Sequence, residues 1–349
     1  MSPAWGPAPA ERSAWPVLPV GEWSDTIETL HRFTQVVGKI RLVCGPWINH
    51  SWGVTLYVTA RGLGTSLVPY GAAGFEINVD LLDSRLRIVT TTGAMRDVPL
   101  ESTSVAAFHD EVLRAMDAVG MPVVISPVPS EIADAVPLTD DTITRDYDAG
   151  HARALWQALV QAHRVFSDFR AGFIGKVSPV HFFWGGFDLA VTRFSGRPAP
   201  PHPGGMPNFP DDVAREAYSH EVASLGFWPG NRQSPTPIFY AYAYPTPAEF
   251  AHAAVEPEAA SWLEGLGEFA LPYDAVRTAN DPDTVLLAFA QSTYAAAADL
   301  AGWDRDALEA SDPHPPSWWH RRPTSDDLGP LRRHPGSTTD FNAVHSSIE

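Results

Sequence analysis

The sequence has almost no cysteine, little lysine and no long apolar run. One cysteine among 349 residues, Cys44, excludes internal disulfides and cysteine-rich zinc sites. It lies in the apolar run 40–44, which predicts a small buried hydrophobe rather than a nucleophile. No stretch approaches the ~20 apolar residues of a membrane span, and residues 1–11 lack a basic and apolar signal pattern. We therefore expect a cytoplasmic protein with no membrane contact.

Basic side chains are scarce as well. The chain carries 24 basic and 41 acidic side chains, a formal charge of -17 that repels polyanions and makes nucleic acid a poor partner. Two of the basic residues are lysines, Lys39 and Lys176, and each follows a glycine. Either both positions need a flexible ammonium that the planar guanidinium of arginine does not replace, or each lysine pairs with a carboxylate at a helix end.

Standard catalytic and cofactor motifs are missing. Neither Gly-Lys pair is a phosphate loop, because Ser or Thr does not follow the lysine. His220-Glu221 begins like a zinc-protease helix, but Ser224 stands where the second histidine would be. The sequence contains no Gly-x-Ser-x-Gly elbow and no dinucleotide-binding glycine pattern. The cofactor, if the protein has one, is therefore unknown.

The hydrophobic periodicity predicts an α+β fold. Helices are expected at about 26–37, 104–119, 149–171 and 284–301. Strands are expected at about 52–61, 75–80, 86–91, 184–193, 218–227 and 237–244. The order helix, strands, helix occurs twice, so we expect two tandem, pseudo-symmetric units with mainly antiparallel sheets and helices packed on one face.

A set of matching residues supports the duplication. Both halves carry Gly-Lys-aliphatic, then Pro, His, Trp-Gly and an Arg nine residues after the Trp. The matched residues are Gly38, Lys39, Pro46, His50, Trp52, Gly53 and Arg61, and Gly175, Lys176, Pro179, His181, Trp184, Gly185 and Arg193. We predict a loose leader over 1–12, repeats over 13–140 and 141–310, a Pro/Gly-rich insertion at 196–210 and a disordered tail over 311–349.

The second predicted repeat is richer in polar and aromatic side chains, and we place the chemistry there. The candidate catalytic residues are His220, Glu221, His181 and Asp188, because imidazoles and carboxylates transfer protons. The candidate ligand-binding residues are Lys176, Arg193, Tyr240, Tyr242, Lys39 and Arg61, because ammonium and guanidinium groups hold anions and phenols form hydrogen bonds. Tyr240, Tyr242 and Tyr244 share one strand face.

Each of these assignments has a structural alternative. His220 aligns with Phe75 and could be a hydrogen-bonded core histidine, and the three tyrosines could form a cross-strand ladder. His181 and His220 with a carboxylate could also hold a metal ion, provided that the two histidines meet, but ligands on separate strands are a weak signal. We therefore assign no metal site, with His181 and His220 as weak candidates, and whether a metal is bound stays open.

Several blocks carry a resemblance to a known family. Residues 175–185, 187–197, 219–221, 226–230 and 239–245, with earlier blocks at 38–42 and 56–62, resemble a bacterial family catalogued only as a domain of unknown function, the family numbered 5996. The resemblance runs from about residue 20 to 310, and it implies no activity. Ser51 stands where an aromatic residue is expected in that family.

We therefore expect a small-molecule enzyme or binding protein for an anionic or polyhydroxylated ligand, with a polar pocket in the second repeat. A non-catalytic interaction protein is the alternative, with a partner chain docked on the loop at Trp228 or on the C-terminal tail. A metal-dependent hydrolase or oxygenase is a third. Whether the protein is an enzyme stays open at this stage.

Overall fold

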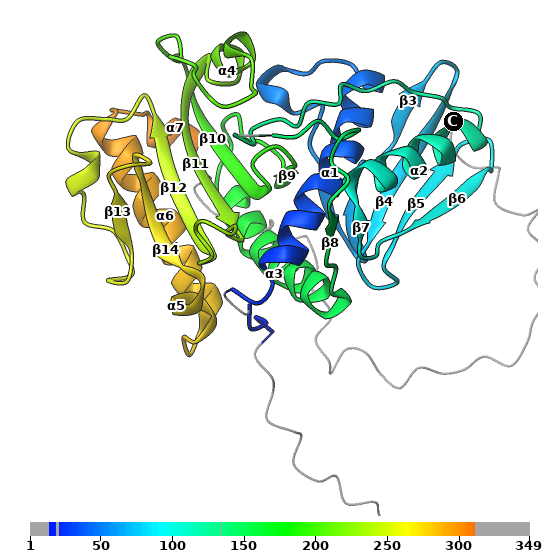
Figure 1. Ribbon diagram of the computed structural model, residues 1–349. Helices are drawn as coiled ribbons and strands as arrows, with labels where there is room; N and C mark the ends of the chain where they lie inside the picture. The colour runs from blue at the N-terminus through cyan, green and yellow to red at the C-terminus, as the bar shows by residue number, and fades with distance from the viewer. Residues whose placement is uncertain (1–13, 19–20, 134, 311–349) are drawn as a thin grey trace, which may run out of the picture. The chain divides into compact units, whose positions relative to one another are not determined.

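The computed structural model describes residues 14–18, 21–133 and 135–310 (Figure 1). It confirms the expected α+β fold: the described residues form two six-stranded antiparallel sheets and one two-stranded sheet, with helices packed against them. The predicted leader and tail lie outside the described residues. None of the helices in the described ranges is long and apolar enough to cross a membrane.

The helices begin where the sequence provides caps. Ser104 accepts a hydrogen bond from the Ala107 amide at the start of α2, and Asp148 and Asp281 cap α3 and α6 in the same way. The α-helices are α1 (Ser24–Cys44), α2 (Val105–Ala118), α3 (Ala149–Ala171), α4 (Asp211–Ala217), α5 (Tyr273–Arg277), α6 (Pro282–Leu300) and α7 (Arg305–Leu308). Two 3-10 turns cover Asn49–Ser51 and Phe250–His252.

The first sheet has the strand order β1-β2-β4-β5-β6, with β3 paired to β4. Its strands are β1 (Tyr57–Thr59), β2 (Gly62–Gly64), β3 (Val68–Tyr70), β4 (Ala73–Asp80), β5 (Arg85–Thr90) and β6 (Met95–Pro99). β4 and β5, which correspond to the strands expected at 75–80 and 86–91, form an antiparallel hairpin with Ile77 opposite Ile88. The short strands β7 (Thr103–Ser104) and β8 (Thr144–Arg145) pair separately.

The second sheet has the order β13-β14-β12-β11-β10-β9. Its strands are β9 (His181–Phe183), β10 (Asp188–Pro198), β11 (His220–Trp228), β12 (Ile238–Tyr244), β13 (Ser261–Leu263) and β14 (Glu268–Pro272). α3 contacts strands of both sheets, and Leu56 pairs with Phe182 across them. The buried apolar residues therefore form one continuous core rather than two.

One of the predicted elements differs from the structure near the matched Gly-Lys pairs. The helix expected at 26–37 continues to Cys44, so Gly38 and Lys39 lie inside α1, whereas Lys176 lies in the loop after α3. Trp184 packs on α1 at Gly38, where a Cβ would stand 2.2 Å from two of the indole atoms. The glycine in α1 thus makes room for the ring. The tandem repeat and the 140/141 boundary stay predictions.

The strands expected around the two Trp-Gly pairs also have different limits. Trp52 and Gly53 follow a 3-10 turn, and the strand there is limited to β1. Trp184 to Phe187 form a turn, so β10 begins at Asp188 and continues to Pro198. Part of the predicted insertion at 196–210 is therefore strand, and the remainder leads into α4.

Candidate functional site

The second sheet has one face turned toward helices α3 and α6 and an opposite face that we call the outer face. Side chains alternate along β10, so Asp188 and Arg193, five residues apart, point to opposite faces. Arg193 lies on the helix face, where its guanidinium is 3.5 Å from the Phe169 ring centroid and 4.2 Å from that of Tyr294. It is 1% exposed and donates to the Phe169 carbonyl. Arg193 is therefore a core residue that no ligand on the outer face can reach.

Asp188 lies on the outer face and accepts a hydrogen bond from the Tyr240 hydroxyl. Tyr240 reaches it by crossing β11 at Gly226, where a Cβ would stand 2.1 Å from the phenol ring. The two predicted site residues are thus brought together by a glycine on the strand between them. Burial raises the pKa of the Asp188 carboxyl to about 6, against the lowering effect of the Tyr240 hydrogen bond.

Further phenols continue from Tyr240 along the same face. Tyr242 stacks against Tyr240 with ring centroids 6.1 Å apart, and its hydroxyl is 3.0 Å from that of Tyr218. His202, from the predicted insertion, stacks on Tyr218 at 4.6 Å. Burial raises the pKa of each of these three phenols, so all stay protonated near neutrality.

Two more carboxyl groups act on the same cluster. Glu131 Oε2 and Asp188 Oδ1 both lie within 4 Å of the point where a Gly186 Cβ would stand. Burial, and next the charge of Asp188, raise the pKa of Glu131 to about 7 and that of Glu268 to about 7. All three acids are half-buried. We call Asp188, Glu131, Glu268, Tyr240, Tyr242 and Tyr218 the acid–tyrosine cluster.

The raised pKa values predict how this cluster affects stability. A carboxyl group that binds its proton more tightly in the folded protein than in the unfolded chain stabilises the fold. This contribution is fully present below about pH 4 and is lost as the pH rises through about 6 to 7. Urea unfolding of the wild type and of a Glu131→Gln/Asp188→Asn variant should therefore show the variant gaining relative stability from pH 4 to 7. Two wild-type histidines act in the opposite direction, because burial lowers the pKa of His31 to about 4 and of His181 to about 3. The variant retains both histidines, so their contribution cancels when the unfolding free energy of the wild type is subtracted from that of the variant at each pH. A difference in unfolding free energy that does not change with pH would contradict the prediction.

A second group of side chains gathers around His50. Lys176 Nζ is 2.6 Å from His50 Nε2 and lies 5.4 Å from the Trp52 ring centroid and 4.9 Å from that of Phe194. The His220 ring is 5.9 Å from the His50 ring. His220 is half-buried and bonded to Ser219 Oγ at 3.1 Å, so it does not occupy a core position like that of Phe75. Two predicted site residues therefore meet through a histidine that the sequence did not single out as chemical.

Lys39 lies elsewhere, inside the core. It is 4% exposed, its Nζ is 3.3 Å from Ser130 Oγ, and it lies over the Trp184 ring at 5.6 Å. Burial lowers its pKa. Neither Lys39 nor Lys176 forms an ion pair with a carboxylate in the described part of the chain, so the proposed pairing at helix ends is wrong for both.

Three other predicted site residues lie outside both groups: two of them have structural partners, and the third is buried. Arg61 is exposed and pairs with Asp80 at 2.5 Å and Asp83 at 2.7 Å. Glu221 accepts from Ser195 Oγ at 2.8 Å and from Arg197 at 2.6 Å. His181 is 1% exposed, and its Nδ1 is buried without a hydrogen-bond partner. No contact joins His181 to His220, and the described ranges contain no group of three or more residues that could hold a metal ion.

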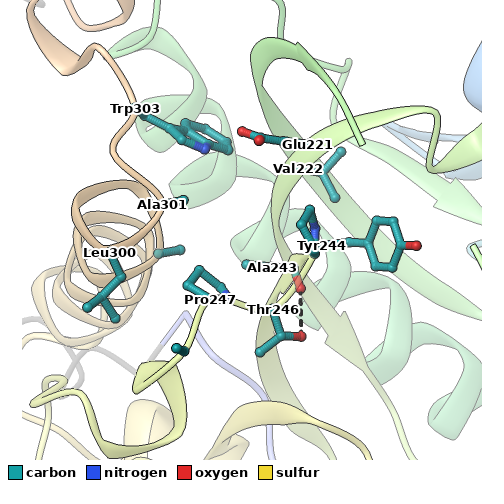
Figure 2. A pocket seen from close by; sticks show the side chains of 12 residues that line it. Glu221, Val222, Ala243, Tyr244, Thr246, Pro247, Leu300, Ala301 and Trp303 are labelled. Atoms are coloured by element: carbon teal, nitrogen blue, oxygen red, sulfur yellow. Dashed lines mark hydrogen bonds between the residues drawn. The ribbon is translucent and has the colours of Figure 1, made fainter. Parts of the chain in front are cut away.

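A cavity of about 230 Å³ lies on the helix side of the sheet, between the ends of β11 and β12 and the end of α6 (Figure 2). Its lining is mostly apolar, with Leu300, Pro247 and Trp303, and Glu221 at the edge. Figure 2 shows the Tyr244 ring turned away from this cavity. The carboxyl groups with raised pKa values, Asp188, Glu131 and Glu268, belong to the cluster on the outer face instead, so we place the candidate site there.

Sequence reasoning missed several members of these groups. Glu131 stands in a Pro-rich segment with no periodic pattern, and Tyr218 lies just before β11, the strand that begins at the candidate residue His220. His50 is one of the residues that match between the two halves, and this match is the signal that the sequence gives for it.

Comparisons with known proteins give a family and nothing finer. A model described as a family of unknown function (DUF5996) matches residues 15–310. No curated protein and no solved structure matches the chain.

Proposed function

The chain belongs to this family of unknown function, and we propose that it is a small-molecule enzyme whose acid–tyrosine cluster performs general acid–base chemistry on a neutral, polyhydroxylated ligand. The observation that carries the proposal is a set of half-buried carboxyl groups, Asp188, Glu131 and Glu268, with pKa values raised to about 6 to 7. Such groups exchange protons near neutral pH, as a general acid or base must.

The partners of these carboxyl groups select between the two ligand classes expected from the sequence. Asp188 accepts from a phenol, and no basic side chain forms an ion pair with Glu131, Asp188 or Glu268 in the described residues. An anionic ligand would meet up to three like charges. A polyol instead finds hydroxyl, phenol and carboxyl groups that both donate and accept, including Thr192 and Ser224, which are 2.9 Å apart.

The chemistry follows from the shared protons. At neutral pH the three carboxyl groups hold fewer than three protons, since their pKa values are about 6 to 7. They keep some of these protons, since the charge of Asp188 raises the pKa of Glu131 and of Glu268. A protonated member gives its proton to a substrate oxygen, and an ionised member takes one from a hydroxyl group or water. Paired carboxyl groups act in this way in glycoside hydrolysis. The Tyr240 hydroxyl holds Asp188 in position for either role.

A ligand screen with matched variants tests the proposal. The purified full chain is screened by thermal shift against neutral mono- and disaccharides and polyols, and against sugar phosphates and carboxylic acids as the anionic set. We expect a neutral compound to bind, and Asp188→Asn to weaken that binding about tenfold or more, because a charge-assisted hydrogen bond is lost. Glu101→Gln, at an exposed carboxylate, is the control.

Two outcomes would reject the proposal. One is binding of the anionic set alone, and the other is unchanged affinity in Asp188→Asn.

Nothing in the described contacts favours the interaction-protein alternative: Trp228 is half-buried, and Arg232 in the following loop pairs with Glu28 of α1. The metal-dependent alternative lacks a three-residue ligand group in the same described ranges.

A further inference from the structure

The group around His50 forms a second reactive site, apart from the acid–tyrosine cluster. We propose that Lys176 is an imine-forming lysine, which condenses with the carbonyl group of an aldehyde or ketone while His50 carries the protons. The proposal rests on the 2.6 Å contact between Lys176 Nζ and His50 Nε2, on the two aromatic rings beside the ammonium, and on the accessibility of the lysine.

The loop before β9 fixes the position of Lys176. The Lys176 carbonyl accepts a hydrogen bond from the Phe194 amide at 3.0 Å, and the Ser178 amide donates one to the Thr192 carbonyl at 2.9 Å. Val177 also pairs with Arg193. The backbone from the Lys176 carbonyl to Ser178 is thus bonded to β10, and the Gly175 amide before it donates to the Leu308 carbonyl, so the side chain leaves from a fixed point although the residue itself is exposed.

Hydrogen bonding sets the tautomer of His50. Its Nδ1 is 2.8 Å from the Ala217 carbonyl, which can only accept, so Nδ1 carries the hydrogen. In the neutral imidazole Nε2 then has a free lone pair, and it faces the Lys176 ammonium. The acceptor for the first proton of the reaction is therefore already in contact with its donor.

The backbone and the surroundings of this pair are unusual. His50 and Ser51 both have left-handed backbone, with φ of 60° and 59°, which is strained for such residues and often marks functional positions. His50 itself is 5% exposed. A carboxylate atom nearby, Glu216 Oε2, is buried without a hydrogen-bond partner, and its charge acts on both Lys176 and His50. Desolvation lowers the pKa of Lys176 and favours the free amine that the reaction needs.

The reaction balances without an added reagent. An ammonium and a carbonyl compound give a protonated imine and one water. Lys176 first passes a proton to His50, and its lone pair then forms the C–N bond while the carbonyl electrons move to oxygen. His50 returns that proton to the oxygen, takes a second one from the nitrogen, and delivers it to the hydroxyl group, which leaves as water. The rings of Trp52 and Phe194 stabilise the cation that results.

The small number of lysines makes the test specific. The full chain is incubated with dihydroxyacetone or pyruvate and sodium cyanoborohydride, which reduces the imine to a stable amine, and the lysine-containing peptides are quantified by mass spectrometry. Lys176 should react at least about tenfold faster than Nα-acetyl-lysine amide, because His50 supplies acid–base catalysis. Lys39, which is 4% exposed, serves as the internal control and should stay unmodified.

Two variants complete the experiment. Lys176→Arg should remove the adduct, and His50→Asn should lower the rate to that of the model amine. Asparagine is chosen because it tolerates left-handed backbone. A rate for wild-type Lys176 no higher than that of the model amine with both probes, or an undiminished rate in folded His50→Asn, would overturn the proposal. The comparison of wild-type Lys176 with the model amine still tests the proposal if a variant does not fold.

Discussion

Replacing Arg193 by alanine should lower the free energy of unfolding by about 2–5 kcal/mol, because it empties a large site in the core. The guanidinium lies over the rings of Phe169 and Tyr294 and donates to the Phe169 carbonyl. Alanine removes the ring contacts and leaves that carbonyl without its donor. Arg193→Met should differ from the wild type by less than about 1.5 kcal/mol, because methionine refills much of the volume without a charge. Burial lowers the pKa of Arg193 to about 10, so this charge is unfavourable where it lies.

Urea unfolding followed by circular dichroism measures both changes. Arg61→Ala is the matched control, since Arg61 is an exposed arginine with two carboxylate partners, and its loss should lower the free energy of unfolding much less than the loss of Arg193. If Arg193→Met is as unstable as Arg193→Ala, the charge and its hydrogen bond, rather than the volume, stabilise this part of the core.

Gly38→Ala should destabilise the protein by about 1–3 kcal/mol, although alanine normally stabilises a helix interior relative to glycine. The new Cβ would stand 2.2 Å from two atoms of the Trp184 ring. That ring cannot easily move, because Trp184 is 5% exposed and its Nε1 donates to the Val54 carbonyl at 2.8 Å. Displacing it would also disturb Lys39, which lies over the same ring.

The same urea experiment tests this sign reversal. Gly265→Ala is the control, because a Cβ there meets nothing within 4 Å, and its effect should stay within about 0.5 kcal/mol. Combining Gly38→Ala with Trp184→Phe should recover part of the loss, since the smaller ring leaves room for the methyl group. A stabilised Gly38→Ala single variant would show that the indole moves aside.

Much of the fold followed from local patterns. The helix expected at 149–171 coincides with α3, and the strands expected at 75–80 and 86–91 correspond to β4 and β5, which pair antiparallel. Periodicity and capping residues act within a few residues of one another, so the sequence shows them directly. The errors came where distant residues pack together: α1 continues through Gly38, and the residue that lies against that glycine, Trp184, comes from a remote segment that no local pattern contains.

The candidate sites were predicted as residues but not as groups. Asp188, Tyr240 and Tyr242 were all named, and the structure joins them. Lys176 and His220 were named too, but they meet through His50, 126 residues before Lys176. Glu131 comes from a segment without periodicity and reaches the cluster near Gly186. Contacts between distant segments depend on how the two sheets and α3 pack, and a single sequence does not encode them as a pattern.

The sequence by itself determined the acidic charge, the single cysteine, the α+β class and the alternation that places Asp188 and Arg193 on opposite faces of β10. Tertiary structure alone decided which face α3 and α6 cover, and hence that the arginine lies in the core while the carboxyl group lies among phenols. The physical reason is desolvation. The chemistry of an ionisable group depends on how much water surrounds it and on which neighbours replace that water, and those neighbours come from remote segments of the chain.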